Sequence, residues 1–200
     1  MVAFLYLMVC FMLPNIICQI ANRKNRKGKK SMVWTVIFWV YCVLVLHVTE
    51  IGTIWDYFSY KQFIGEINRD FFSYKLFMGE INLDPFSYGI TVGHLLNIVM
   101  FMPLGFLLPF LWKNYCKIWK TAFVGLFFSF LIEICQLFCY RVTDVDDLIM
   151  NTLGSIVGFL LWKIFGSFFR KKQKKTVPRS NTEPIVSMIL GIAGVFFLYH

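Results

Sequence analysis

Apolar residues along the chain fall into six long runs separated by polar stretches. The runs cover Val2–Ile20, Met32–Val48, Thr91–Trp112, Thr121–Tyr140, Val145–Phe165 and Pro184–Tyr199. A helix needs about 17 to 25 apolar residues to cross a bilayer. The pattern therefore predicts an all-α fold, a polytopic transmembrane helical bundle of about six spans, with a long extracellular loop between the second span and the third.

The polar stretches divide the chain into four parts. Residues 1–48 are expected to form two helices joined by a basic loop, 49–90 the long loop, 91–165 a three-helix core, and 166–200 a basic loop and a last helix. Within the long loop, residues 58–70 recur as 72–84 with 10 of 13 positions identical. Loop closure entropy grows slowly with length, so this duplication is expected to be an expanded surface loop.

Composition and charge agree with a membrane protein. Hydrophobic residues make up 58% of the 200 positions and charged residues only 16%, far from the balance of an ordinary globular domain. The net charge of +9 comes mainly from basic clusters after the first, third and fifth runs. Loops rich in Lys and Arg stay in the cytoplasm, so both termini are predicted to be extracellular. No basic domain with interleaved aromatic residues accompanies the charge, so no nucleic-acid binding is expected.

Polar residues in the fourth and fifth runs occupy one narrow face of each predicted helix. The two sets are Gly125, Ser129, Glu133, Gln136 and Tyr140, and Asp144, Asp147, Asn151, Gly154 and Gly158. At about 100° per residue, each set spans an arc of roughly 80°. The small residues Gly125, Ser129, Gly154 and Gly158 are expected to let helix backbones pack closely. The two faces are therefore predicted to meet.

The polar positions also share one depth. Glu133 is predicted about 10 Å, and Asn151 about 6–9 Å, below the outer ends of their helices. Asn97 enters the third helix from the same side, and Arg141 lies in the turn above. An ionisable side chain in a membrane costs roughly 2.5–3.5 kcal/mol and usually faces a protein interior or a wet cavity. We therefore interpret these polar residues as lining a hydrated cleft that opens outward. Pro103 and Pro109 are expected to bend the third helix.

Structural roles remain open for each of these residues. Glu133 is either a neutral carboxylic acid between helices, an ion-pair partner of Arg141, or part of a site. The amides are either helix-to-helix hydrogen bonds or ligand contacts, and the acids at 144, 146 and 147 include helix N-caps. His94 is expected to be packed rather than a ligand. The sequence predicts no metal site, cofactor or committed catalytic centre, although a three-acid cluster leaves Mg²⁺ or Ca²⁺ open.

These residues resemble the VanZ-like membrane family, which is associated with teicoplanin resistance. The matching segments are Asn82–Phe86, Leu96–Phe106, Glu133 with Gln136, Arg141, and Asp144–Gly158, and the match is strong from about Asn82 to Trp162. The resemblance implies a multi-pass protein of a Gram-positive cell membrane. The partners it implies are membrane lipid and either a glycopeptide antibiotic or a lipid-linked peptidoglycan precursor.

Three hypotheses follow for function. The first is a non-enzymatic resistance factor of the outer leaflet, whose ligand-binding residues are Asn97, Glu133, Gln136, Arg141, Asp144, Asp147 and Asn151. The second is a membrane-embedded enzyme acting on a lipid-linked envelope substrate, with Glu133 or Asp147 as general base and Arg141 stabilising phosphate charge. The third is a transporter or scaffold, for which the Pro-interrupted third helix is the pointer. We favour the first.

Overall fold

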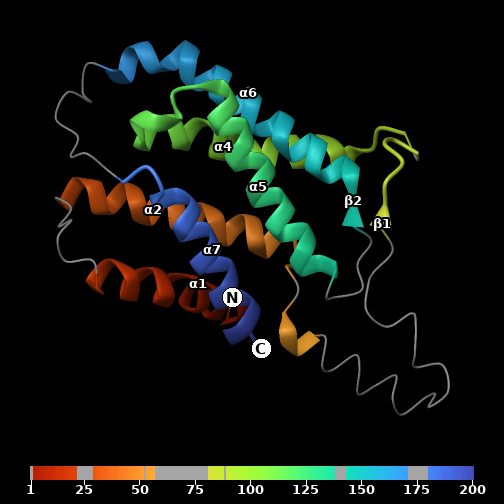
Figure 1. The fold of residues 1–200 in the computed structure, drawn as a ribbon, viewed down its shortest axis with the longest axis horizontal. Coiled ribbons are helices and arrows are strands. Elements are labelled where there is room, and N and C mark those ends of the chain that lie inside the picture. Colours follow the sequence, from red (N-terminus) through yellow and green to blue (C-terminus); the bar gives the residue numbers. More distant parts are fainter. Residues whose placement is uncertain are drawn as a thin grey trace.

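Six helices of 16 residues or more dominate the described part of the computed structural model, which comprises residues 2–21, 29–51, 53–56, 81–87, 89–137, 143–170 and 180–200. Figure 1 shows their arrangement. In chain order the elements are α1 (Val2–Ala21), α2 (Lys29–Val48), β1 (Ile81–Asn82), α4 (Val92–Leu111), the 3₁₀ turn η2 (Lys113–Tyr115), α5 (Ile118–Leu137), β2 (Thr143–Asp144), α6 (Val145–Arg170) and α7 (Glu183–Leu198). The duplicated loop and Arg141 lie outside the described residues, apart from the end of the second copy.

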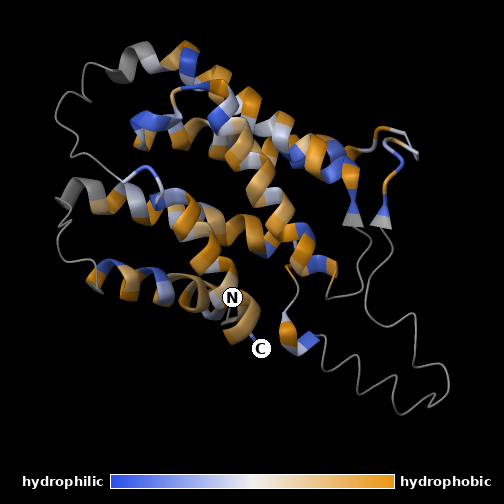
Figure 2. Ribbon diagram, viewed as in Figure 1, coloured by the Kyte–Doolittle hydropathy of each residue, from blue (hydrophilic) through white to orange (hydrophobic). Residues whose placement is uncertain are grey.

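The helical prediction is confirmed, with ends shifted by a few residues. Four helices are long and apolar enough to cross a membrane, namely those within α1, α4, α5 and α6. The apolar helices Met32–Val48 and Glu183–Leu198 are shorter. Figure 2 shows hydrophobic residues along the helices and hydrophilic residues gathered towards their ends. The one departure from an all-helical structure among the described residues is the two-residue pairing of β1 with β2.

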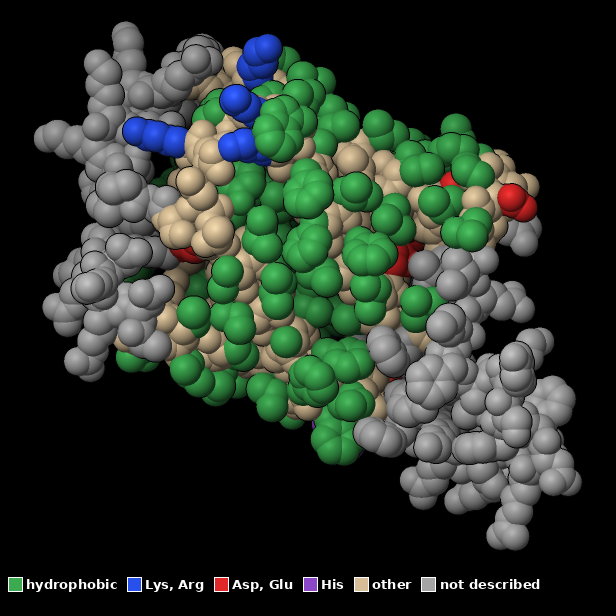
Figure 3. Space-filling model, viewed as in Figure 1, with side chains coloured by type: hydrophobic (Ala, Val, Ile, Leu, Met, Phe, Trp, Pro, Cys, Tyr) green, Lys and Arg blue, Asp and Glu red, His purple; other side chains and the backbone are tan. Residues whose placement is uncertain are grey.

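Charge is divided between the two ends of the bundle. In Figure 1, α1, α4 and α6 run from right to left, and α2, α5 and α7 run back. Four lysines with described side chains lie at the left end, on or beside η2, at the start of α5 and in α6: Lys113, Lys117, Lys120 and Lys163. The acids of the 49–56 and 81–91 segments and of the start of α6 lie at the right end, and Figure 3 shows this separation on one face. Within the described part, Glu183 is the acid that lies among the lysines; its carboxylate accepts a hydrogen bond from the Trp112 indole.

Aromatic side chains mark both ends as well. At the end that carries the termini, the Trp55 ring lies 5.0 Å from that of His200, and the Tyr6 ring 5.3 Å from that of Tyr199. At the opposite end, Trp34, which is 40% exposed, packs against Phe110. Aromatic belts of this kind are typical of the two membrane–water interfaces. The bundle is therefore built as expected for helices that cross a bilayer.

The closest packing joins α4 and α6 and corrects one prediction. A Cβ on Gly154 would lie 2.4 Å from the Ile98 carbonyl oxygen, and one on Gly158 would lie 1.9 Å from that of Met102. These glycines were expected to face the preceding helix, but they face α4, which runs parallel to α6. Gly125 and Ser129 follow the expectation, since a Cβ on Gly125 would meet the Ser155 side chain of α6 and Ser129 accepts a hydrogen bond from Asn151 of α6. Backbone approach without a Cβ gives the van der Waals contact that holds membrane helices together.

The prolines of the third apolar run do not interrupt it. The helix α4 is continuous from Val92 to Leu111, with Pro103 and Pro109 inside it. The interruption of this helix, which was the pointer to a transporter or scaffold, is therefore wrong, and the bend at the prolines stays a prediction. The same stretch packs tightly on α6, since a Cβ on Gly105 would lie 1.9 Å from the Ser155 carbonyl oxygen.

The termini pack against each other in a second layer. Gly191 and Gly194 of α7 lie against Phe11 and the Cys10 carbonyl of α1. The side-chain amide of Asn15 donates to the carbonyl oxygens of Phe11 and Ser187, at 3.0 and 3.2 Å. The two chain ends consequently meet at one end of the bundle, as Figure 1 shows.

Candidate functional site

Two segments far apart in the chain meet where α4 and α6 begin. Ile81 pairs with Thr143 and Asn82 with Asp144 in parallel register. The Asn82 side-chain amide lies 3.4 Å from the Asp144 carboxylate, which also accepts the Asp146 backbone N–H at 3.0 Å. Asp144 therefore caps the N-terminus of α6, as expected for an acid at this position.

Asp146 ties the turn before α4 to α6. Both of its carboxylate oxygens accept the Phe86 backbone N–H, at 2.9 and 3.1 Å, and Phe86 adopts a left-handed φ of 57°. His94 Nε2 lies 3.5 Å from the same carboxylate. His94 Nδ1 accepts the Thr91 backbone N–H at 3.0 Å, which leaves the ring proton on Nε2, facing Asp146.

These contacts give His94 and Asp146 a joint structural role, in which they hold the turn before α4 against α6. His94 is 8% exposed and Asp146 3%, and each ring nitrogen of His94 has its own partner. An imidazole committed on both sides holds a turn in place rather than binding a ligand, which agrees with the expectation of a packed His94. At about 100° per residue, Asp146 points away from the face shared by Asp144 and Asp147, about 100° round from Asp147, and only the folded turn gives it a partner.

Asn97 and Asp147 join α4 to α6 directly. The Asn97 side-chain amide donates to Asp147 Oδ1 over 2.6 Å, and both residues are half-buried. A short hydrogen bond to a carboxylate is among the stronger polar contacts in a protein. Oδ2 of Asp147 and the side-chain oxygen Oδ1 of Asn97 are further acceptors at this end of the bundle.

Asn151 and Ser129 join α6 to α5 one turn deeper. The Asn151 amide donates to Ser129 Oγ over 2.9 Å, and both side chains are buried. Asn151 Oδ1 has no hydrogen-bond partner within the described residues. This contact is where the two predicted polar faces do meet.

Glu133 shares the level of Asp147. α5 and α6 run in opposite directions, and Glu133 lies four residues beyond Ser129 while Asp147 lies four before Asn151. Both carboxyl groups are thus about 6 Å nearer than the Ser129–Asn151 bond to the end of the bundle where α5 ends and α6 begins. Glu133 is 3% exposed.

Gln136 takes a different partner. Its amide donates to the Thr49 carbonyl oxygen at the end of α2 over 2.9 Å, so it links α5 to α2 rather than to the carboxylates. The structure thus brings together Asn97, Asp144, Asp147 and Asn151 around the start of α6, and Glu133 lies on α5 at the depth of Asp147. Arg141, the remaining predicted ligand residue, lies outside the described residues.

The polar side chains around the start of α6 form a cluster rich in hydrogen-bond acceptors at one end of an apolar bundle. The Asn82 and Asn97 amides lie against Asp144 and Asp147, while Asp84 is exposed on the turn above. Among the described residues, no group of three or more His, Cys, Asp or Glu side chains is arranged to hold a metal ion. What the cluster offers chemically is hydrogen-bond acceptors for a polar group at this end of the bundle.

The fold and this polar end together define an integral membrane helical protein. The family model for VanZ/LLP1 matches residues 2–166, and the chain belongs to that family. A relative from Enterococcus faecium, Protein VanZ, is 35% identical over 78 residues, which is 38% of this chain and 48% of that protein. The chain thus matches about half the length of this relative. No solved structure matches the chain.

Proposed function

We propose that this protein contributes to resistance against teicoplanin and other lipid-tailed glycopeptides by binding, in the outer leaflet, the polar part of the drug or of a lipid-linked cell-wall precursor. The Asn97–Asp147 hydrogen bond at the start of α6 carries the proposal. It is a polar contact between two apolar helices at the acidic end of the bundle. An ionisable side chain within a membrane-spanning helix is functional by default, because placing its charge in hydrocarbon is costly.

The proposal includes an orientation. Six spans, with α2 and α7 crossing as the shorter ones, bring the lysine-rich end to the cytoplasm and the acidic end to the outside. Both termini are then extracellular, and the host is a Gram-positive bacterium, whose precursors face outward. The short apolar helices fit a span of about 17 residues with little tilt.

The test uses a glycopeptide-sensitive Gram-positive host that expresses the full chain. Asn97→Leu removes the donor to Asp147 and keeps the side-chain volume similar. Protection against teicoplanin is expected to fall to that of the empty vector. Asn15→Leu is the matched control, since Asn15 is also a buried amide that bridges two helices but lies in the layer of α1 and α7.

Membrane levels of each protein decide the interpretation. Full protection by Asn97→Leu at wild-type abundance would refute the site. Equal protection by the wild type against tailed and untailed glycopeptides would remove the lipid tail from the proposal. Reduced abundance of Asn97→Leu alone would assign the bond to folding, and Asp147→Asn, which retains the shape of the pair, then repeats the comparison.

A further inference from the structure

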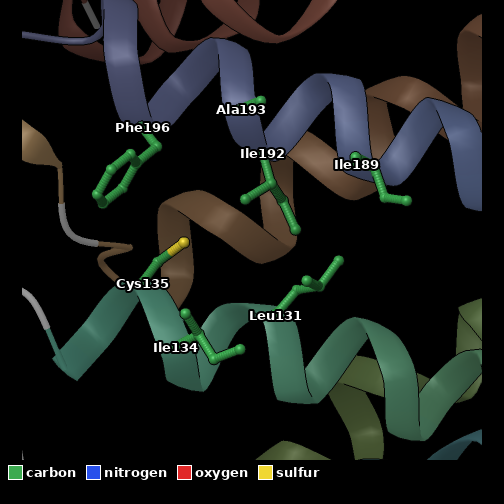
Figure 4. A pocket seen from close by; sticks show the side chains of 7 residues that line it. All are labelled: Leu131, Ile134, Cys135, Ile189, Ile192, Ala193 and Phe196. Atoms are coloured by element: carbon green, nitrogen blue, oxygen red, sulfur yellow. The ribbon is translucent and has the colours of Figure 1, made fainter.

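The hollow between α5 and α7 gives no basis for choosing one ligand over another. Figure 4 shows its lining, in which Leu131 and Cys135 of α5 face Ile192 and Phe196 of α7. All the lining side chains are hydrophobic, and lipid tails are equally apolar, so burial there gives no preference among them. Selection has to come from polar groups, and the candidate site at the start of α6 supplies them.

Oxygen acceptors are what the start of α6 still offers to a ligand. The Asn97 amide already donates to Asp147 Oδ1, and the Asn151 amide already donates to Ser129 Oγ. Three oxygens remain beyond these bonds, namely Oδ2 of Asp147, Oδ1 of Asn97 and Oδ1 of Asn151. Asp147 and Asn97 are half-buried, so both retain surface at the acidic end of the bundle.

Asn151 contributes the buried acceptor of this set. Its side chain is 3% exposed, and its Oδ1 accepts no hydrogen bond from the described residues. The Cα–Cβ bond of a helical residue tilts toward the helix N-terminus, so Asn151 leans toward Asp147, one turn nearer the start of α6. Cβ atoms at this spacing are about 5–6 Å apart. Because an unpaired buried acceptor is destabilising, a donor that reaches Oδ1 is favoured.

The acids around these oxygens have neutral partners within the described part of the chain. Asp144, Asp146 and Asp147 accept hydrogen bonds from backbone N–H groups and side-chain amides. His94 faces Asp146, but its Nδ1 accepts the Thr91 N–H, so the ring is neutral. The four lysines with described side chains lie at the opposite end of the bundle. The carboxylate charge at the start of α6 is therefore not offset by a described cation.

We propose that the group recognised at the start of α6 is a primary ammonium of the ligand rather than a phosphate. This inference rests on the proposed function and names the chemical class of the polar part that binds. A primary ammonium has one positive charge and three N–H donors, which complement a carboxylate with two further oxygens near it. A phosphate would bring negative charge and more acceptors to a place that already has both, and like charges disfavour binding. Pairing with a cation also offsets the cost of a carboxylate at membrane depth.

Two sources could present such a group in the outer leaflet. One is a glycopeptide with a free amino group, and the other is a lipid with an aminoacylated head group. The experiment therefore has two arms, both with the full chain in phosphatidylcholine nanodiscs and with empty nanodiscs subtracted. Calorimetry compares a teicoplanin-type glycopeptide with the same compound acetylated on its amino group. Native mass spectrometry compares the retention of lysyl-phosphatidylglycerol with that of phosphatidylglycerol.

The ammonium form is expected to bind about tenfold or more tightly than its partner in at least one arm, and that arm identifies the source. In Asp147→Asn, which removes the charge and keeps the shape, this ratio should fall close to one. Asp84→Asn is the matched control, because Asp84 is an acid at the same end but is exposed on the turn. Its ratio should equal that of the wild type.

The outcomes separate this inference from the proposed function. Equal binding of the paired compounds in both arms, with binding still lost in Asn97→Leu, overturns the ammonium and leaves the proposed site intact. Stronger retention of phosphatidylglycerol overturns the ammonium as well. No binding in either arm overturns both proposals.

Two further results would also overturn the inference. An ammonium preference that Asp147→Asn retains places the recognition elsewhere. Ammonium binding that appears only in Arg141→Gln shows that a cation of the chain itself occupies the acceptors. Should Asp147→Asn fail to accumulate, Asn151→Leu, which removes the buried oxygen, is expected to lower the ratio, and an unchanged ratio refutes the site.

Discussion

Replacing Gly158 with alanine is expected to push α4 and α6 apart. The new Cβ would lie 1.9 Å from the Met102 carbonyl oxygen and 2.8 Å from its carbon. These are backbone atoms and cannot rotate away, so the helices must separate by about 1 Å to restore ordinary contact. Overpacking of this kind costs about 1–3 kcal/mol.

Gly166→Ala supplies the matched control on the same helix. Its Cβ would meet only the Trp162 ring, at 3.4 Å, and alanine favours helix over glycine by about 1 kcal/mol at either position. The propensity gain therefore cancels in the comparison. Gly158→Ala is expected to be less stable than Gly166→Ala by the overpacking cost alone.

The measurement is the thermal unfolding midpoint of the purified proteins in detergent. For a chain of this size, each kcal/mol corresponds to roughly 2–4 °C, so the two variants should differ by at least a few degrees. Equal midpoints would refute the claim that α4 and α6 meet at these glycines. The same geometry gives a second prediction. Gly158→Ala should also weaken protection of the host against teicoplanin, because Asn97 and Asp147 bridge the same pair of helices.

Three further predictions concern single polar contacts, each measured as the thermal midpoint in detergent. Ser129→Ala should cost about 1–3 kcal/mol by leaving the buried Asn151 amide unpaired, and adding Asn151→Leu should recover part of the loss; a double variant less stable than the single one would contradict this. Asp146→Asn should weaken its hydrogen bonds to the 84–87 turn and cost about 1–3 kcal/mol, whereas Asp84→Asn on the exposed turn should change little. Burial raises the pKa of Tyr115, whose hydroxyl donates to the Asn181 carbonyl over 2.6 Å. The stabilisation that the neutral Tyr115 hydroxyl provides should persist below pH 10 and disappear as the pH rises through the folded-state pKa. Tyr115→Phe should lack that loss, and identical pH profiles of the two proteins would reject the assignment.

The apolar pattern was sufficient for the helices themselves. A run such as Val145–Phe165 must be helical in a membrane, because every backbone N–H and C=O has to be satisfied within the segment. The same reasoning expected a cap among the acids at 144, 146 and 147, which Asp144 supplies. It put Glu133 level with Asn151, but in the structure Ser129 is level with Asn151 and Glu133 lies one turn away. Family membership was also readable from the motifs, and the match to residues 2–166 confirms it.

Periodicity gives the face of a helix but not the helix that covers it. Gly154 and Gly158 pack on α4 instead of α5, and Gln136 reaches Thr49 at the end of α2. The sequence contains no rule for choosing among helices that are all equally apolar, because the choice depends on how closely two backbones fit once every helix is present.

What the sequence by itself determined is an all-helical membrane protein with its polar groups near one end. The tertiary structure decided which of those groups touch. The parallel pairing of β1 and β2 brings Asn82 to Asp144, and the turn held by Asp146 brings in His94. A hydrogen bond requires its donor and acceptor to lie within about 3 Å of each other. For residues some 60 positions apart, that distance depends on how whole helices are rotated and shifted relative to one another.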